Sequence, residues 1–308
     1  MHAVSTSTRN PGQREGTLSD EDVASYHEKG YLTVRSALDQ ELVGRMRDVT
    51  LDLFRQSGEL TASTEHFDIG PGHTKERPIL RRISRPTEVH EVFVEVAFES
   101  KVGDIVAELI GRPVKFYHAK VNFKLPSSTV SDVQWHQDWP HFPHTNYDML
   151  AISVPMHART IETGCIQVVE ASHKEGPLST WRDGRYVFTC EHSMKPSDFD
   201  RIAFMECEPG DVLAHHGLTV HASTPNPSDT LIATLTIQYA AADAFAYTAP
   251  VIDSIHRNRM VRGEPSRFAR VDAGMIELPP DFSAGYKSLF ALQDSAQSGT
   301  KTANQGYY

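Results

Sequence analysis

The chain has 308 residues, 39% of them hydrophobic, and a formal net charge of −10 at pH 7. An acidic balance of this size disfavours nucleic acid and anionic membranes as partners, and no run of roughly 18 apolar residues offers a membrane span or a signal peptide. Three widely spaced cysteines, Cys165, Cys190 and Cys207, predict neither a disulfide framework nor a cysteine-rich zinc site. We therefore expect a reducing, cytoplasmic setting.

The length suits one large catalytic domain, because jelly rolls with added helices often exceed the usual domain size. We expect this domain over residues 17–292. Residues 1–16 and 293–308 are rich in small and polar side chains and predict flexible tails.

The first third of the domain has helical patterns. Ser19 is a suitable N-cap before an acidic first turn, and Gly30 is a suitable end for that helix. A second helix is expected over 39–56, where apolar residues recur at spacings of three and four. A third helix is expected over 92–110, before a Gly-Arg-Pro stop.

From residue 114 onward the patterns predict short strands. The expected runs are 114–124, 149–156, 165–169, 211–213 and 231–239, separated by Pro, Gly, Asn and Asp as in an antiparallel sandwich. In the first run, alternation places one polar set on a single face: Phe116, His118, Lys120, Asn122 and Lys124. This face could line a pocket or be solvated, and the pattern supports both interpretations equally.

The motif with the most chemical information is His136-Gln137-Asp138, followed much later by His221. Two imidazoles and one carboxylate can hold one face of a non-haem ferrous ion and leave places for a 2-oxo acid and dioxygen. If the segment is extended, His136 and Asp138 point the same way and can reach one metal. The chain has 16 histidines, and we expect four competitors to be structural or to face the ligand carboxylate or the substrate: His141, His144, His215 and His216.

Further motifs occur in a fixed order around this one. They are Leu18-Ser19-Asp20-Glu21-Asp22-Val23, Gly30-Tyr31-Leu32, Trp135-His136-Gln137-Asp138, Gly164-Cys165-Ile166-Gln167, Ser172-His173, Gly210-Asp211, and His221-Ala222-Ser223 with Asn226 and Ser228. In this order they resemble the phytanoyl-CoA dioxygenase (PhyH) family of Fe(II)/2-oxoglutarate oxygenases, from about Leu18 to Ala242.

The resemblance implies a mainly β fold with some α structure, a double-stranded β-helix (jelly roll, cupin-like) with flanking helices. It also implies that His136, Asp138 and His221 bind iron, and that Gln137 and Ser223 lie beside the co-substrate. Related halogenases lack the carboxylate, so the intact Asp138 indicates an oxidation without halogen transfer.

One position departs from the family. An arginine eleven residues beyond the second histidine usually pairs with the distal carboxylate of 2-oxoglutarate, and here that position is Ile232. A buried dicarboxylate without a cation would be costly, so the anchor must lie elsewhere or the co-substrate must differ. Lys120 is the replacement that we predict, and Arg81 with its neighbour Arg82 is the next candidate.

These observations predict a non-haem iron(II)- and 2-oxoglutarate-dependent dioxygenase. Its default reaction would be hydroxylation of a C–H bond in a small organic molecule, and a secondary metabolite is favoured. The loops over 139–147 and 174–204 are expected to hold that substrate. Three alternatives stay open: an iron oxygenase or isomerase that does not use 2-oxoglutarate, a non-catalytic ligand-binding jelly roll, and a zinc hydrolase.

Overall fold

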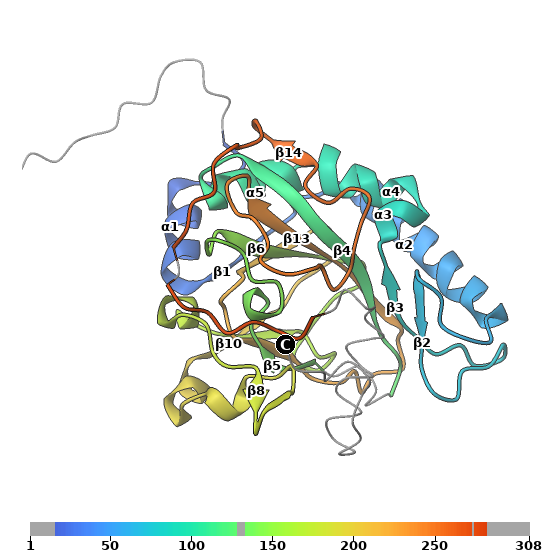
Figure 1. Cartoon of the computed structure of the whole chain (residues 1–308). Coiled ribbons are helices and arrows are strands. Elements are labelled where there is room, and N and C mark those ends of the chain that lie inside the picture. The colour runs from blue at the N-terminus through green and yellow to red at the C-terminus, as the bar shows by residue number, and fades with distance from the viewer. Residues whose placement is uncertain (1–15, 128–132, 273, 282–308) are drawn as a thin grey trace, which may run out of the picture.

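The computed structural model describes residues 16–127, 133–272 and 274–281 (Figure 1). Two antiparallel sheets face each other and form the double-stranded β-helix that the resemblance implied. Both predicted tails lie outside the described residues, apart from Gly16.

The large sheet contains, in spatial order, β1 (Tyr31–Val34), β11 (Val212–His216), β6 (Met149–Pro155), β13 (Ile232–Ala241), β4 (Val114–Lys124), β3 (Leu80–Ser84) and β2 (Phe67–Ile69), with β14 (Met260–Arg262) paired to β4. The small sheet contains β10 (Ile202–Met205), β7 (Ile166–Val169), β12 (His221–Ser223) and β5 (Val133–His136). A separate hairpin consists of β8 (Trp181–Arg182) and β9 (Arg185–Tyr186). Each strand predicted from alternation is present, with ends shifted by a few residues.

The first two helices begin where their capping residues predict. Helix α1 (Asp20–Lys29) starts with a complete capping box at Ser19, and Gly30 ends it in a left-handed conformation at φ 85°. Helix α2 (Gln40–Gln56) begins after Asp39, whose carboxylate accepts hydrogen bonds from the first turn. Side-chain acceptors therefore satisfy backbone N–H groups that have no partner within the helix.

The single helix predicted over 92–110 is instead interrupted. Helix α4 (Glu91–Val94) continues as a π-helical turn (Glu95–Glu99), and α5 (Val102–Ile110) starts after a break. At the break Ser100 is extended, its hydroxyl donates to a carbonyl of the preceding turn at 2.7 Å, and it accepts from the first N–H of α5 at 3.2 Å. The serine ends one helix and caps the next, a competition with the backbone that apolar spacing alone does not reveal.

The short remaining helices connect these elements. They are α3 (Pro86–Val89) and the 3-10 turns η1 (Ser57–Glu59), η3 (Trp139–His141), η4 (Ser172–Glu175), η5 (Glu191–Ser193) and η6 (Pro196–Arg201). No helix in the described part of the chain is both long and apolar enough to cross a bilayer.

Helices cover the outer face of the large sheet (Figure 1). Met46 of α2 and Ile105 of α5 pack in one cluster with Ala119, Val121 and Phe123 of β4, and all five are buried. With this face filled by apolar side chains, the opposite face of β4 can carry polar groups toward the small sheet.

A β-bulge changes which side chains share the polar face of β4. Gln238 pairs with His118, whereas the next residue, Tyr239, pairs with Phe116, so the register shifts between them. Phe116 consequently packs against Tyr239 in the helix-covered core and not on the polar face predicted for it. Lys120, beyond the bulge, faces the space between the sheets as the alternation predicted.

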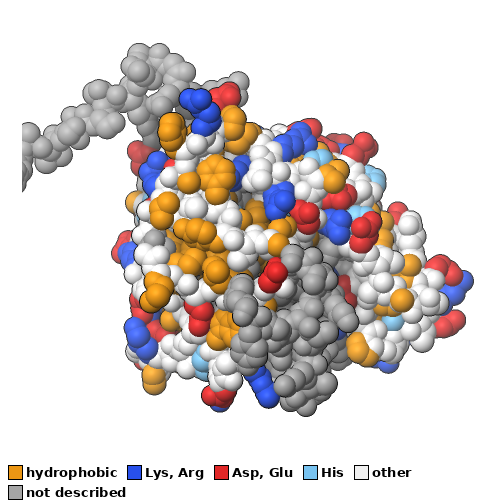
Figure 2. Space-filling view, viewed as in Figure 1, with side chains coloured by type: hydrophobic (Ala, Val, Ile, Leu, Met, Phe, Trp, Pro, Cys, Tyr) orange, Lys and Arg blue, Asp and Glu red, His pale blue; other side chains and the backbone are white. Residues whose placement is uncertain are grey.

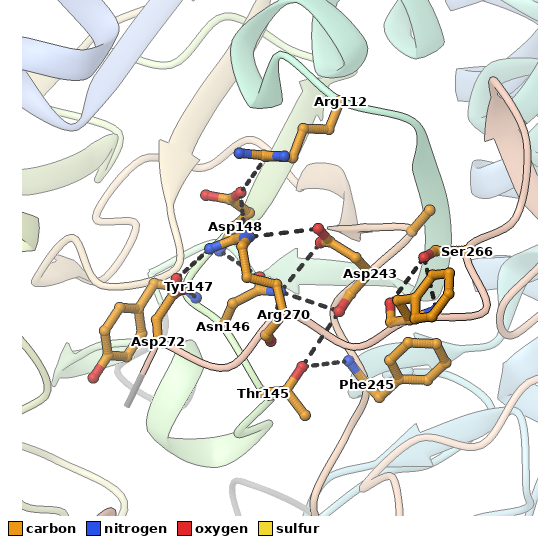
Figure 3. Close-up of polar contacts among 12 residues, drawn as sticks. Arg112, Thr145, Asn146, Tyr147, Asp148, Asp243, Phe245, Ser266, Arg270 and Asp272 are labelled. Carbon is orange, nitrogen blue, oxygen red and sulfur yellow. Dashed lines mark hydrogen bonds and ion pairs between the residues drawn. The ribbon is translucent and has the colours of Figure 1, made fainter. Parts of the chain in front are cut away.

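The segment after β14 is tied to the body by one arginine (Figure 3). The guanidinium of Arg270 forms ion pairs with Asp148, Asp243 and Asp272, and the Nε to Asp243 distance is 3.4 Å. Asn146 also donates to the carbonyl of Arg270 at 3.3 Å. Two of these carboxylates, Asp148 and Asp243, fix this segment against the turns before β6 and after β13, and Asp272 lies in the segment itself.

The face shown in Figure 2 carries hydrophobic side chains between scattered charges. Among the described residues, several of the large exposed hydrophobic ones follow β13: Phe245, Tyr247, Ile255, Phe268, Val271 and Met275. Scattered exposed apolar residues are common on soluble proteins and by themselves identify no partner.

Candidate active site

The three predicted metal ligands come together between the sheets. His136 ends β5 and pairs with His221 at the start of β12, so the two imidazoles are neighbours. Nε2 of His136 lies 3.8 Å from Oδ1 of Asp138, and Nε2 of His221 lies 3.9 Å from Oδ2. One potential ligand atom from each residue lies within 4.8 Å of the others, and all three residues are buried.

Asp138 reaches the histidines through a turn and not through an extended strand. Strand β5 stops at His136, and Asp138 has helical backbone angles of φ −74° and ψ −41° at the start of η3. The turn is held by the N–H of Trp139, which donates to the carbonyl of Gly217 at 2.8 Å. The predicted convergence is present, but the strand alternation that we used to predict it is not its cause.

Both histidines present the nitrogen that a metal needs. Nδ1 of His136 lies 2.8 Å from the carbonyl oxygen of Gln134, and Nδ1 of His221 lies 3.0 Å from that of Thr219. A carbonyl only accepts, so each Nδ1 carries the proton and each Nε2 presents a lone pair. Burial lowers the pKa of both imidazoles to about 3, which keeps them in the neutral, ligating form. This donor set fits a divalent metal such as iron(II).

Two further side chains fix the carboxylate of Asp138. Gln238 on β13 donates from Nε2 to Oδ2 at 2.7 Å, and Nε2 of His215 lies 3.2 Å from the same oxygen. Burial would raise the pKa of Asp138, but His221 and His215 outweigh it and hold that pKa well below its usual range. The residue remains an anionic ligand. Gln238 was not predicted from the sequence, although its side chain lies on the same face of β13 as those of Thr234 and Thr236.

A cavity extends from these residues between the two sheets and occupies about 770 Å³ with its open mouth included. The large sheet contributes a row of residues from β3, β4, β13 and β6: Arg82, Lys120, Asn122, Phe123, Lys124, Thr234, Thr236 and Ser153. The small sheet contributes Ile166 and Ser223 beside the two histidines, and Arg159 enters from the connection that follows β6. Lys120 pairs directly with Thr236, and Thr236 with Ser153, so the lysine and the hydroxyl groups are neighbours on one wall.

Two of the four residues predicted to contact the co-substrate line this cavity, namely Lys120 and Ser223. Gln137 does not line it. Its amide nitrogen donates to the carbonyls of Leu218 at 2.7 Å and Gly176 at 3.0 Å, so it ties two loops together. The change of direction after His136 turns the Gln137 side chain away from the cavity.

Arg81 also lies outside the cavity lining. Its guanidinium pairs with Asp68 on the neighbouring strand β2 at 2.9 Å. Because successive side chains of a strand alternate, Arg82 is the residue of β3 that faces the cavity. The two arginines are neighbours in the sequence and could not be told apart without the register of β3.

Lys120 has an unusual environment. It makes no hydrogen bond or ion pair with any residue in the described part of the chain. Burial, followed by the nearby charge of Arg82, lowers its pKa to about 8. The side chain is half-buried, and an ammonium group partly withdrawn from water without a counter-charge favours a bound anion.

Arg159 is a cavity residue that the sequence analysis did not identify. Its side chain is almost fully buried, Nη1 donates to the hydroxyl of Thr234 at 2.9 Å, and Nη2 donates to the carbonyl of Gly164. No carboxylate of the described residues pairs with it, and its Nε has no hydrogen-bond partner. No local motif surrounds it, so only the folded structure could reveal it.

Two buried histidines with unsatisfied nitrogens lie close to the metal ligands. Neither ring nitrogen of His118 has a hydrogen-bond partner, and Nε2 of His141 has none either. The ring of His141 stacks on Phe188 at 3.8 Å and lies 5.8 Å from the ring of His136. Buried polar atoms without partners are rare and indicate a position where a ligand or water binds.

Comparison with known proteins identifies what this arrangement resembles. The family model for phytanoyl-CoA dioxygenase (PhyH) matches residues 26–231. A protein of Stutzerimonas stutzeri described as "Probable alpha-ketoglutarate-dependent hypophosphite dioxygenase" is 28% identical over 267 residues, which cover 84% of this chain and 90% of that protein. The "Methylphosphonate hydroxylase" of Gimesia maris is 23% identical, with coverage of 73% and 82%. Among solved structures, apo EctD from S. alaskensis matches with a TM-score of 0.66 at 18% identity, covering 82% of this chain and 90% of that one, and this likeness supports the fold.

Proposed function

The chain belongs to the phytanoyl-CoA dioxygenase family and is an iron(II)- and 2-oxoglutarate-dependent dioxygenase, and we propose that its substrate is a small phosphorus oxyanion. The reaction would convert R–H, 2-oxoglutarate and dioxygen into R–OH, succinate and carbon dioxide. One oxygen atom enters the product and the other enters succinate. Oxidation of the substrate supplies half of the electrons that reduce dioxygen, and oxidative decarboxylation of 2-oxoglutarate supplies the other half.

The observation that carries this proposal is the unpaired ammonium of Lys120 beside the metal site. It lies on the side of the cavity that Arg82 and Lys124 also line. A neutral or hydrocarbon substrate would leave this half-buried cation without a partner, whereas an oxyanion compensates its charge. An anionic group is thus the feature of the substrate that this side of the cavity favours.

Some of the relatives support the same class, while others are described as a phytanoyl-CoA dioxygenase or a 1-deoxypentalenic acid hydroxylase. One is described as acting on hypophosphite and another on methylphosphonate, which are both small phosphorus oxyanions. In one the bond to be oxidised would be P–H and in the other C–H, and both need a strong oxidant held close to a small anion. The secondary metabolite favoured by the sequence alone remains a different prediction, and the test below separates the two.

Each part of the site has a distinct task in this proposal. Bound iron(II) supplies the centre at which 2-oxoglutarate and dioxygen react. Gln238 and His215 hold the carboxylate of Asp138 in its ligating orientation. Ser223, two residues beyond the ligand His221, offers a hydroxyl to the co-substrate on its side of the cavity. Burial of all three metal ligands limits access of water during turnover.

Turnover with a panel of matched compounds tests the proposal. The iron-loaded protein is given 2-oxoglutarate, dioxygen and hypophosphite, methylphosphonate or 2-aminoethylphosphonate, and succinate and the oxidised phosphorus product are quantified. The dimethyl ester of methylphosphonate is the uncharged control. We expect at least one anion to give product and succinate in equal amounts, and the ester to give none. Succinate formation stimulated only by uncharged or large apolar compounds would overturn the proposed substrate class.

A further inference from the structure

We propose that Arg159 binds the distal carboxylate of 2-oxoglutarate. It would take the role of the family's arginine, whose position is occupied here by Ile232. The inference rests on the 2-oxoglutarate-dependent activity and is independent of the proposed phosphorus substrate. It gives the co-substrate to Arg159 and leaves Lys120 free for another anion.

The position of Arg159 supports this assignment. Arg159 comes from the connection between β6 and β7, and its guanidinium contacts Thr234 on the cavity face of β13. Residues 232 and 234 lie on the same face of that strand, because they are two apart. A guanidinium delivered by Arg159 therefore reaches the part of the cavity next to the start of β13, where an arginine at position 232 would also be located.

The charge of the Arg159 guanidinium also supports the assignment. Arg159 carries a buried cation that no described carboxylate neutralises, although two of its N–H groups already bind neutral oxygens. Desolvation of an unpaired cation is costly, and a bound carboxylate would offset that cost. Arginine retains further N–H donors after two are used, so a carboxylate can still be bound.

The third argument is the path from the metal to Arg159. Ser153, Thr236 and Ser223 line it with hydroxyl groups, and Ile166 lines it with a hydrocarbon surface. Thr236 pairs directly with Ser153 on the neighbouring strand, so these two hydroxyl groups are side by side on the wall that the large sheet forms. Such a path suits a short molecule that binds metal at one end, has methylene groups in its middle and ends in a carboxylate.

The fourth argument is that the backbone of Arg159 is fixed before any ligand binds. Its N–H donates to the carbonyl of Cys207 at 2.7 Å, and its carbonyl accepts from the N–H of Cys207 at 2.9 Å. Two bonds to a single residue hold this part of the connection against the segment after β10. A preorganised cation loses little entropy when the anion binds.

Two other assignments compete with this one. Lys120 was the anchor that the sequence favoured, and it would then hold the co-substrate and not the substrate. Arg159 could instead be purely structural, since it links Thr234 to Gly164. A structural arginine affects folding, whereas an anchor affects the affinity for one carboxylate in particular.

The experiment measures 2-oxoglutarate binding without turnover. Iron(II)-loaded protein is titrated anaerobically with 2-oxoglutarate while the visible metal-to-ligand charge-transfer absorbance is followed, and the titration is repeated with 2-oxobutyrate, which lacks the distal carboxylate. We expect Arg159→Met to weaken 2-oxoglutarate binding by roughly 100-fold, the loss typical of a buried charge pair that has lost one partner. We expect little change for 2-oxobutyrate, so the preference between the two acids should disappear.

Arg81→Met is the matched control, because Arg81 and Arg159 are both 6% exposed and Arg81 pairs with Asp68 outside the cavity. It should lower stability and leave the preference for 2-oxoglutarate intact. The double variant Arg159→Met/Ile232→Arg should recover part of the lost affinity, because it restores a cation at the same end of the cavity.

Several outcomes would overturn the assignment. One is a folded Arg159→Met protein, with wild-type binding of manganese(II), that still prefers 2-oxoglutarate over 2-oxobutyrate. Another is a result in which Lys120→Met loses the preference for 2-oxoglutarate and Arg159→Met keeps it. If Arg159→Met does not fold, Arg159→Lys decides the question: the shorter cation should weaken 2-oxoglutarate selectively, and equal binding to wild type would exclude Arg159 as the anchor. A negative result for phosphorus substrates in the turnover assay leaves these binding outcomes unaffected.

Discussion

Gln238 donates a 2.7 Å hydrogen bond to Oδ2 of Asp138, and in this way a strand of the large sheet orients a metal ligand that follows the small sheet. The two residues are far apart in sequence, and each depends on the other: the carboxylate gains a fixed orientation and the buried amide gains a partner. Groups that orient metal ligands commonly change metal affinity by 10- to 100-fold, roughly.

Gln238→Leu should accordingly weaken iron(II) binding by about 10- to 100-fold. The variant keeps the approximate size of the side chain and removes the donor to Asp138. Cobalt(II) titration under anaerobic conditions measures the affinity. Gln167→Leu is the control, because Gln167 lies on β7 with its side chain on the opposite face from the cavity residue Ile166. Equal metal affinity in Gln238→Leu and wild type would show that this hydrogen bond does not position the ligand.

The affinity for an oxyanion substrate should fall as pH rises through about 8. Burial lowers the pKa of Lys120 to about 8, so its ammonium is present below that pH and is lost above it. The KM of a substrate whose own charge is constant in this range should therefore rise from pH 7 to 9. In Lys120→Arg the rise should be absent, since arginine stays protonated. A rise of the same size in that variant would assign the titration to another group.

Gly164→Ala should destabilise the protein more than Gly111→Ala. Both glycines have positive φ angles, 73° and 69°, so both substitutions incur the left-handed penalty of about 1–2 kcal/mol. At Gly111 an added Cβ meets nothing within 4 Å, whereas at Gly164 it would lie 2.6 Å from the carbonyl oxygen of Pro225. We expect about 1–3 kcal/mol more from this overpacking. Urea unfolding of both variants measures the difference, and equal losses would contradict the close approach.

Zinc should bind the same three ligands and fail to support oxidation. Two neutral imidazoles and a carboxylate suit zinc as well as iron, so Zn²⁺ should raise the thermal midpoint by mass action. Oxygen uptake with 2-oxoglutarate should occur only with iron(II). Hydrolytic activity of the zinc form without oxygen would instead support the zinc hydrolase alternative.

Local patterns predicted the scaffold well where a single element determines the outcome. The cap at Ser19 and the left-handed Gly30 bound α1 as expected, because capping depends on neighbouring residues only. The polar alternation of β4 predicted which residues share a face with Lys120, and the structure places that lysine at the cavity, one of the two positions that the pattern allowed. It failed at Phe116, where a bulge opposite Gln238 and Tyr239 shifts the register, and no local pattern in β4 encodes a bulge of its partner strand.

The convergence of His136, Asp138 and His221 was predictable because few chemistries need two imidazoles and a carboxylate, and the family resemblance indicated which histidines to choose. The residues around them were harder to predict because their roles depend on pairing between distant strands. Arg82 and Arg81 differ only by which face of β3 they occupy. Arg159 lies in a connection, and it becomes a cavity residue only through its contact with Thr234.

The central claim is that two cations of one cavity bind two different anions, Arg159 the co-substrate and Lys120 the substrate. The most direct test is the Lys120→Met variant, in which the affinities for 2-oxoglutarate and for an accepted phosphorus oxyanion are both measured anaerobically from the visible absorbance of the iron(II) complex. The account predicts that substrate affinity falls by at least about tenfold while 2-oxoglutarate affinity is unchanged. A loss of 2-oxoglutarate affinity with unchanged substrate affinity would contradict it and would make Lys120 the co-substrate anchor.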